Sequence, residues 1–383
     1  MNKPESHLIP WKKADRIKCI DKPADRGGHS QQMFSARHKE CPDLITLKQI
    51  AAEAGVSTMT VSNVIHQNYA RVSPATVEKI QAIIEKYHYV PNMAARSLVR
   101  KSSRIIALLL PIWYADTGSL LFNPYVGNMV GTLDMLIRKA GYYTMLCSFR
   151  NVEEVLSFQR NWQIDGSIMV LPHLEEITHG LVEQTQTPLV VMDRRYDDIA
   201  MNSVTLNDRR GGYLATKYLL ERGHQKIGFA CPGHLLDSFV LTERYMGYAE
   251  AHREYGLVPD NRWLFENYPQ LEGGKRLGNE LIEMEQRPTA LVSTEDIMAC
   301  GVVQTLIKAR WKLPRDLSIV GFDDSAPAEL ITPALTTVRQ DVRLKAEKAF
   351  EMMLEAIRND DRRINRFFEL DVSITERDSV ARL

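Results

Sequence analysis

Long apolar runs are missing from this chain of 383 residues. The longest apolar stretch, from Ile105 to Ile112, is far shorter than the roughly 20 residues that a membrane-spanning helix needs. The N-terminus carries scattered charges and lacks an apolar segment followed by small residues, so it does not have the pattern of a secretory signal. These absences predict a cytoplasmic protein with no membrane partner.

Cysteine is scarce, odd in number and widely spaced. The chain has five, at Cys19, Cys41, Cys147, Cys231 and Cys300. A disulfide framework needs an even set, so this usage indicates a reducing compartment. Two histidines, His29 and His38, lie between the first two cysteines, but the spacing is looser than that of zinc ligands. We therefore expect no metal and no cofactor.

The motifs of common enzyme classes are also missing. The sequence contains no Gly-x-Ser-x-Gly, no His-Glu-x-x-His and no Gly-x4-Gly-Lys-Ser/Thr. Its ten histidines do not cluster with acidic residues at the spacing of metal ligands. An α/β enzyme is thereby disfavoured, and we expect a protein that is not an enzyme.

The chain has no net charge, with 48 Lys and Arg against 48 Asp and Glu. The two signs are nevertheless segregated, because residues 1 to 104 hold 17 Lys and Arg against 9 Asp and Glu and the remainder carries the opposite excess. Lys and Arg that neutralise phosphates supply most non-specific affinity for DNA. The distribution favours a basic DNA-contacting head on an acidic body.

The length exceeds what one hydrophobic core usually organises, so we expect several domains. Residues 1 to 43 are polar and aperiodic and are predicted to be a flexible extension, in which Met33 is an alternative start. Residues 44 to 90 are predicted to form a helical head, 91 to 103 a hinge helix and linker, and 104 to 383 a ligand-binding and dimerisation core of two lobes.

Three short helices are predicted in the head. Thr46 and Gln49 form a capping box before the first helix. Ser57 caps a second helix, Thr58 to Ile65, and Ser73-Pro74 opens a third that has Tyr87 on its apolar face. A helix, a turn containing glycine and a second capped helix can place that second helix in the DNA major groove, although similar pairs occur in proteins that do not bind DNA.

Apolar runs alternate with amphipathic stretches in the rest of the chain. Strands are predicted at 105–110, 143–147, 167–171, 189–192, 226–230, 290–293 and 318–322, and helices at 126–139, 212–222, 243–255, 274–285, 298–309 and 344–358. Such alternation indicates an α/β fold of doubly wound parallel sheets, with a ligand at the carboxyl ends of the strands. About ten strands suggest two sheets and hence two lobes.

The head resembles the DNA-binding domain of the LacI/GalR family of repressors. The resemblance is carried by TLKQIAAEAGVSTMTVS at 46–62, VSPATV at 72–77 and YVPNMAARSL at 89–98. It continues in the body, in order and spacing, through segments such as LLERGH at 219–224, RYMGY at 244–248, VGFDD at 320–324 and LTTVRQ at 335–340. It implies a periplasmic-binding-protein-like core joined to a helix-turn-helix head.

The resemblance also implies which residues contact double-stranded DNA: Thr46, Ser57, Thr58, Met59, Thr60, Ser62, Asn63, Asn92, Ala95 and Leu98. Most members have an arginine where this chain has Asn63, and Asn prefers adenine where arginine prefers guanine. Leu98 falls where the family inserts leucine into the minor groove. Homodimers on a near-palindromic operator follow from two-fold symmetry.

For the core, the resemblance implies a small-molecule effector, which we expect to be a neutral sugar. The expected contacts are Tyr125, Ser148, Asp193, Arg244, Glu295, Asp323 and Gln340. Relatives typically have Asn where this chain has Glu295, a change that favours a cationic or hydroxyl-rich ligand over an acidic one. The sequence does not decide whether the effector is an inducer or a co-repressor. It also leaves open whether the protein is a dimer or a tetramer. A transport-type binding protein is the main rival, but it would need a signal peptide and no basic head.

Overall fold

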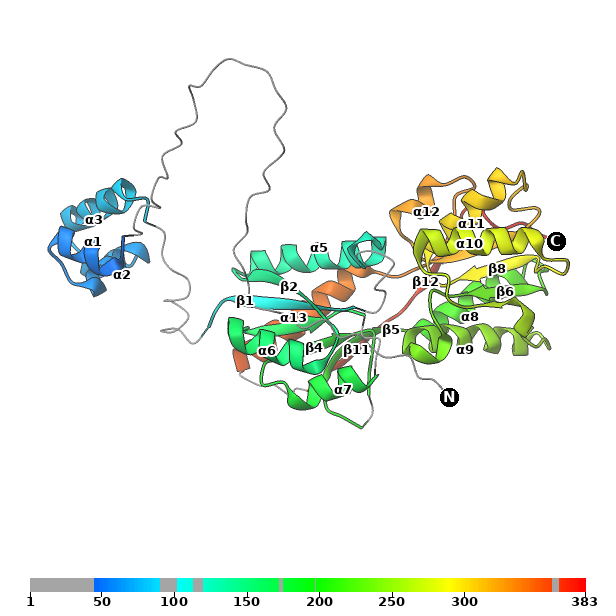
Figure 1. The fold of residues 1–383 in the computed structure, drawn as a ribbon, viewed down its shortest axis with the longest axis horizontal. Helices are drawn as coiled ribbons and strands as arrows, with labels where there is room; N and C mark the ends of the chain where they lie inside the picture. The colour runs from blue at the N-terminus through cyan, green and yellow to red at the C-terminus, as the bar shows by residue number, and fades with distance from the viewer. Residues whose placement is uncertain (1–44, 90–101, 113–119, 172–174, 197, 360–364) are drawn as a thin grey trace, which may run out of the picture. The chain divides into compact units, whose positions relative to one another are not determined.

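The computed structural model describes residues 45–89, 102–112, 120–171, 175–196, 198–359 and 365–383. The chain divides into two compact units, residues 1–91 and 92–383, which are described separately below (Figure 1). The extension predicted at 1–43 and most of the hinge predicted at 91–103 lie outside the described residues. No helix in the described ranges is both long and apolar enough to cross a lipid bilayer.

The first unit packs three helices around a small core. They are α1 (Leu47–Ala54), α2 (Thr58–Ile65) and α3 (Pro74–Lys86), with a 3-10 turn at Tyr69–Arg71. The predicted caps are all present, at Thr46, Ser57 and Ser73. Ile50, Val61 and Ile80 are completely buried between the helices. The placement of Tyr87 on the apolar face was wrong, because this residue ends α3 and is 42% exposed, while Tyr89 packs on the core instead.

The second unit begins with a six-stranded, all-parallel sheet in the order β11-β5-β4-β3-β1-β2. Its strands are β1 (Ile105–Pro111), β2 (Tyr143–Phe149), β3 (Gly166–Met169), β4 (Leu189–Met192), β5 (Asn202–Leu206) and β11 (Phe367–Leu370). Alternate residues of β1 enter different cores: Leu108 packs with α5 (Pro124–Lys139) and α13 (Val342–Asn359), and Leu109 with α6 (Val152–Trp162). Helix α7 (Glu175–Gln184) joins α6 on that face.

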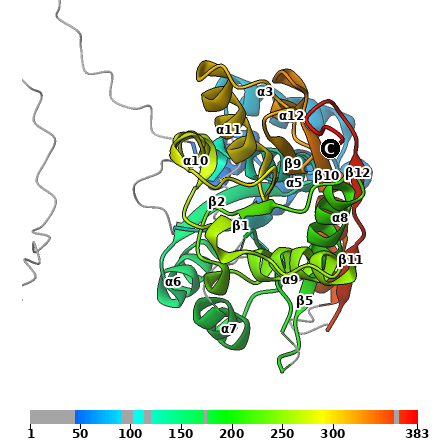
Figure 2. The same cartoon turned by 90° about the vertical axis from the view of Figure 1, so that its right-hand side faces the viewer.

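A second sheet has the order β12-β10-β9-β8-β6-β7, in which only β12 is antiparallel to its neighbour. Its strands are β6 (Ile227–Ala230), β7 (Leu264–Phe265), β8 (Ala290–Ser293), β9 (Ser318–Asp323), β10 (Thr336–Arg339) and β12 (Ser373–Thr375). Helices α8 (Asp208–Leu220) and α9 (Phe239–Glu254) cover one face, and α10 (Gln270–Glu283) and α11 (Asp296–Lys308) the other (Figure 2). The short α12 (Ala326–Leu330) follows β9.

The chain passes between the two sheets three times, after β5, after β10 and after β11. The two sheets therefore form two lobes joined by adjacent connections, and the predicted two-lobed α/β class is confirmed. The carboxyl ends of β4, β8, β9 and β10 lead directly to polar residues that face the space between the lobes. This is where doubly wound folds place their ligands.

Candidate functional site

The N-terminal half of α2 presents small polar side chains and one methionine to solvent. Ser57 caps the helix, and its Oγ accepts a hydrogen bond of 3.1 Å from the backbone N–H of Thr60. On the inner face Val61 is completely buried, whereas Met59 on the outer face is 68% exposed. The helix is thus held by its inner face and leaves its first turn available for contact with another molecule.

The sequence-predicted DNA contacts divide into two sets. The structure exposes Ser57, Thr58 and Met59, and leaves Thr60, Ser62 and Asn63 half-buried along α2. Thr46 lies at the start of α1, where its backbone N–H and hydroxyl each donate a 2.8 Å hydrogen bond to Oε1 of Gln49. The three remaining candidates, Asn92, Ala95 and Leu98, lie outside the described residues.

The described part of the head is almost neutral. Residues 45–89 contain four basic side chains, Lys48, Arg71, Lys79 and Lys86, against three glutamates. One basic side chain is already engaged, because Lys86 Nζ lies 2.8 Å from Oε1 of Glu53. The basic excess of residues 1 to 104 therefore belongs mainly to the sequence on either side of the three helices, including Arg96, Arg100 and Lys101.

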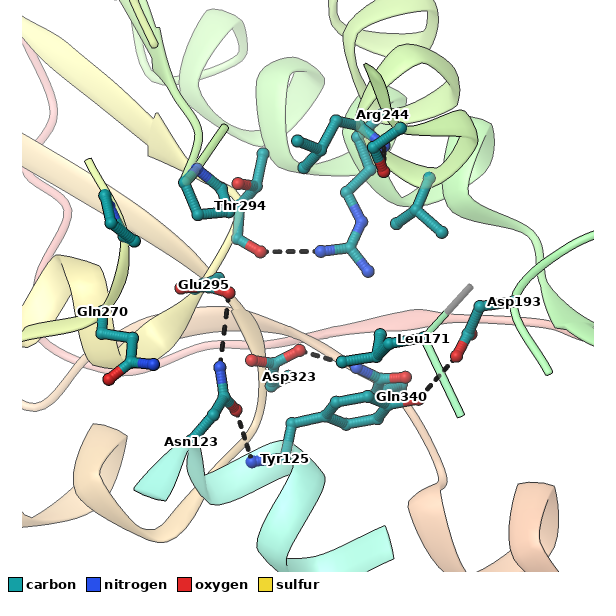
Figure 3. A pocket seen from close by; sticks show the side chains of 15 residues that line it. Asn123, Tyr125, Leu171, Asp193, Arg244, Gln270, Thr294, Glu295, Asp323 and Gln340 are labelled. Atoms are coloured by element: carbon teal, nitrogen blue, oxygen red, sulfur yellow. Dashed lines mark hydrogen bonds between the residues drawn. The ribbon is translucent and has the colours of Figure 1, made fainter. Parts of the chain in front are cut away.

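A pocket of about 820 Å³, including its opening, lies between the lobes of the second unit (Figure 3). Six of the seven effector contacts predicted from the sequence line it: Tyr125, Asp193, Arg244, Glu295, Asp323 and Gln340. Ser148 does not. Ser148 lies exposed on β2, the edge strand of its sheet, and the structure does not bring it together with the other six candidates.

Arg244 projects into the pocket from α9 and is fixed on three sides. Its Nε donates to Oδ1 of Asp208 at 2.8 Å, and its Nη1 donates to the carbonyl oxygen of Thr294 at 2.7 Å. The guanidinium also lies over the ring of Phe322, with 3.4 Å between its central carbon and the ring centroid. A preorganised guanidinium of this kind can present its remaining N–H groups to ligand oxygens.

Two glycines allow α9 to approach α8 closely enough to aim Arg244. A Cβ on Gly212 of α8 would lie 1.9 Å from the carbonyl oxygen of Arg244, and one on Gly247 of α9 would lie 1.8 Å from that of Arg209. No side chain fits at such distances, so the backbone itself forms the contact between the helices.

Asp323 and Gln340 form a pair at the ends of β9 and β10. Gln340 Nε2 donates to Oδ1 of Asp323 at 2.6 Å, and both side chains are buried. Oε1 of Gln340 has no hydrogen-bond partner in the part of the chain that the structure describes. Burial raises the pKa of Asp323 to about 7, against the opposing effect of the Arg244 charge. This corner therefore offers a buried acceptor and a carboxyl that titrates near neutrality.

Glu295 lies at the start of α11 and contacts the other lobe. Its Oε1 accepts a 3.3 Å hydrogen bond from Nδ2 of Asn123, whereas Oε2 is buried with no partner among the described residues. Burial raises the pKa of Glu295 to about 7, although the nearby Arg244 lowers it. The carboxyl is therefore not the permanent anion that its residue type suggests.

Tyr125 and Asp193 meet Lys345, a residue that the sequence analysis did not single out. Lys345 Nζ pairs with Asp193 and donates to the hydroxyl of Tyr125 at 3.0 Å, and that hydroxyl donates to Oδ2 of Asp193 at 3.2 Å. Lys345 shares the buried face of α13 with Ala349 and Met353. A lysine on the apolar face of a predicted helix was the signal that could have identified it.

Asp296 is a second missed residue, buried behind the pocket wall. Its carboxylate accepts from the backbone N–H of Ser325 at 2.8 Å and from the hydroxyl of Thr337 at 2.6 Å. Burial raises its pKa to about 8, with the charge of Asp323 acting in the same direction. No group of three or more His, Cys, Asp and Glu in the described ranges is arranged to hold a metal ion.

Comparisons with known proteins match both parts of the chain. Residues 46–92 match the model of bacterial regulatory proteins of the lacI family, and residues 216–380 match a periplasmic binding protein-like domain. The transcriptional repressor PurR of Vibrio atlanticus is 33% identical over 345 residues, which cover 89% of this chain and all of that protein. PurR of Aliivibrio salmonicida is 32% identical over 348 residues, with the same coverage.

Solved structures show the same fold. The lac repressor dimer bound to operator and the anti-inducer ONPF has a TM-score of 0.76 at 23% identity, over 88% of this chain and 99% of that chain. A LacI-family regulator of Enterococcus faecium with bound ribose has a TM-score of 0.62 at 24% identity, over 73% of this chain and 99% of that chain.

Proposed function

Because the chain belongs to the LacI family of bacterial regulatory proteins, we propose that it acts as a repressor that places α2 in the major groove of a near-palindromic operator. Family membership makes it a DNA-binding transcription regulator that responds to a small molecule. The residue assignments, the homodimer and the cytoplasmic location belong to the proposal. So do the domain boundaries predicted from the sequence and the contact of Leu98, which lies outside the described residues, with the minor groove.

One observation carries the DNA-binding part of this proposal: α2 is capped and buried on one face, yet it exposes Met59 and Thr58 in its first turn. A large apolar side chain that is 68% exposed contributes little to folding. It suits contact with the methyl group of thymine, while the hydroxyls of Ser57 and Thr58 suit phosphates or base edges.

For the pocket we propose a small carbohydrate. The buried Oε2 of Glu295 and Oε1 of Gln340 have no hydrogen-bond partner among the described residues, and such acceptors call for the hydroxyl donors of a ligand. Arg244 supplies donors to ligand oxygens, and Tyr125 supplies an aromatic wall. The relatives named above are repressors and not enzymes, and we propose that the pocket carboxyls bind a ligand and do not catalyse a reaction.

Coupling between ligand and DNA would follow from the position of the pocket. Asn123 and Glu295 join the two lobes by a hydrogen bond across it. A ligand that binds the open and closed arrangements of the lobes unequally shifts their populations, and in a dimer this changes how two heads are presented to two half-sites. The sign of the response is left to experiment.

The test is the selection of bound duplexes from a random pool by the full chain, with and without a panel of sugars. We expect a two-fold symmetric site whose recovery changes with at least one sugar. The double variant Thr58→Ala, Met59→Ala should lose the selected site, whereas Gln81→Ala, on the exposed face of α3, should retain it. Binding that is equal for the selected and a scrambled duplex would refute the proposal.

A further inference from the structure

We propose that the ligand carries a protonated amine, which lies against the carboxyl of Glu295 beside Asp323. This inference rests on the proposed role of the pocket as a ligand site and names the chemical class of that ligand as an amino sugar. It replaces the neutral sugar that the sequence analysis favours.

The charges in and around the pocket do not balance. The described residues place two cations there, Arg244 and Lys345, against five carboxyls, of Asp193, Asp208, Glu295, Asp296 and Asp323. Each cation already has an acidic partner, because Lys345 pairs with Asp193 and Arg244 with Asp208. Three carboxyls therefore lack a cation, and burying charge without an opposite charge is costly.

Asp296 differs from the other two carboxyls because residues of its own lobe satisfy its hydrogen bonds. Both of its oxygens accept hydrogen bonds from residues of the same lobe, and it does not line the pocket. Glu295 and Asp323 line the pocket, and the side-chain hydrogen bonds that they accept from described residues come from Asn123 and Gln340 respectively. The two carboxyls without a cationic partner therefore face the space that a ligand would occupy (Figure 3).

A second and independent observation points to the same kind of ligand. Oε1 of Gln340, a buried and neutral side chain, also lacks a donor among the described residues. An ammonium group offers three N–H donors and no acceptor, so it can serve several acceptors at once and supply the missing charge. A hydroxyl offers one donor and no charge.

The two ligand types differ in how their binding depends on pH. Without a cation, Glu295 and Asp323 keep protons near neutrality because burial raises the pKa of each to about 7. An ammonium group favours the ionised carboxyls, so its binding releases protons and its affinity rises with pH. The charged groups that act on these two carboxyls are Arg244, Lys345 and Asp296, and Glu295 also acts on Asp323. Cys231 lies near Glu295. A neutral sugar needs no such release.

The experiment is calorimetric titration of the full-length protein with matched pairs, D-glucosamine with D-glucose and D-galactosamine with D-galactose, at pH 5.5 and pH 7, where the amine of each amino sugar is mainly protonated. We expect the amine of at least one pair to bind at least tenfold more tightly than its neutral partner. That advantage should grow by at least threefold between pH 5.5 and pH 7, and the heat measured in buffers of different ionisation enthalpy should report proton release.

Substitutions show which carboxyl causes the preference for the amine. Glu295→Gln keeps the size of the side chain and should reduce the preference for the amine to less than threefold, whereas Glu285→Gln, exposed beyond α10, should leave it unchanged. If Glu295→Gln does not fold, the proton release of the unmodified protein still decides the question.

Equal affinity within every pair, or a preference that persists in Glu295→Gln, would overturn the proposal of an amine. Failure of every sugar to bind would overturn the carbohydrate as well, while duplex selection without ligand tests the DNA-binding role independently.

Discussion

The two units of this chain hold their functional side chains in opposite environments. On α2, Met59 and its neighbours are exposed and make no contribution to the core, which is formed by residues such as Ile50 and Val61. In the pocket, Arg244 and Asp193 are buried and paired with other charged residues. Binding and folding are therefore separable in the head, whereas in the pocket the same contacts serve both.

Breaking a buried charge pair should test this contrast most severely. Lys345→Met leaves Asp193 buried without its cation and should lower the free energy of unfolding by about 3 to 5 kcal/mol. Urea denaturation of the full chain measures it. The matched change Lys348→Met removes the half-buried partner of the exposed Glu351 on the same helix and should cost less than about 1 kcal/mol. Equal losses would show that the buried pair has no special structural role.

The close contact between α8 and α9 offers a second test. Gly212→Ala would place a Cβ 1.9 Å from the carbonyl oxygen of Arg244, so α9 must move and take that guanidinium with it. Overpacking of this kind should cost about 3 kcal/mol and weaken ligand binding. Gly131→Ala, where a Cβ meets nothing within 4 Å, should be neutral or stabilising by up to about 1 kcal/mol. Thermal unfolding with and without ligand checks both.

The contrast also explains what could be read from the sequence. The caps at Thr46, Ser57 and Ser73 and the bounds of α2 depend on neighbours within a few residues, and they were predicted correctly. Strand β5, which follows no clear apolar pattern at Asn202–Leu206, was missed because its burial comes from β4 and β11, segments distant in sequence.

Residues of the pocket could be predicted from the sequence only where the family resemblance pointed to them. Asp193 and Arg244 were placed in it, but their partners, Lys345 and Asp208, were not identified because these pairs join residues 152 and 36 positions apart. Ser148 is not brought to the pocket with the others, because the sequence does not reveal that β2 is an edge strand. The spacing of residues within one segment can predict an exposed surface. A buried site also depends on contacts between residues far apart in the sequence, which that spacing does not reveal.

Titration gives a third way to sharpen the comparison. A carboxyl whose pKa is raised in the folded state holds its proton longer than in the unfolded chain, so the stability it confers is lost as pH rises. For Glu295 the window runs from its ordinary value of 4.5 to about 7. The buried His224 and His252, whose pKa values are lowered by burial, act in the opposite direction. The informative quantity is therefore the difference in the free energy of unfolding between the unmodified protein and the variant Glu295→Gln.

That difference should shift by about 2 kcal/mol between pH 5.5 and pH 7.5, with the variant gaining relative to the unmodified protein as pH rises. Urea denaturation at the two pH values measures it, and Glu285→Gln, an exposed glutamate, provides the baseline. A shift of the opposite sign would mean that Glu295 is stabilised as an anion by the folded protein, which is inconsistent with the unbalanced charge of the pocket.

Met59 combines the smallest expected change in stability with a large expected effect on operator affinity. Met59→Ala should alter the free energy of unfolding by no more than about 0.5 kcal/mol, because the side chain is 68% exposed. It should nevertheless weaken binding to the selected operator at least tenfold, a loss of about 1.4 kcal/mol, in fluorescence anisotropy with labelled duplexes. A scrambled duplex should be bound as before, because non-specific affinity comes from basic side chains that the substitution leaves in place. If stability and operator affinity fell together, the head would resemble the pocket, and the separation of folding from recognition would not hold for this chain.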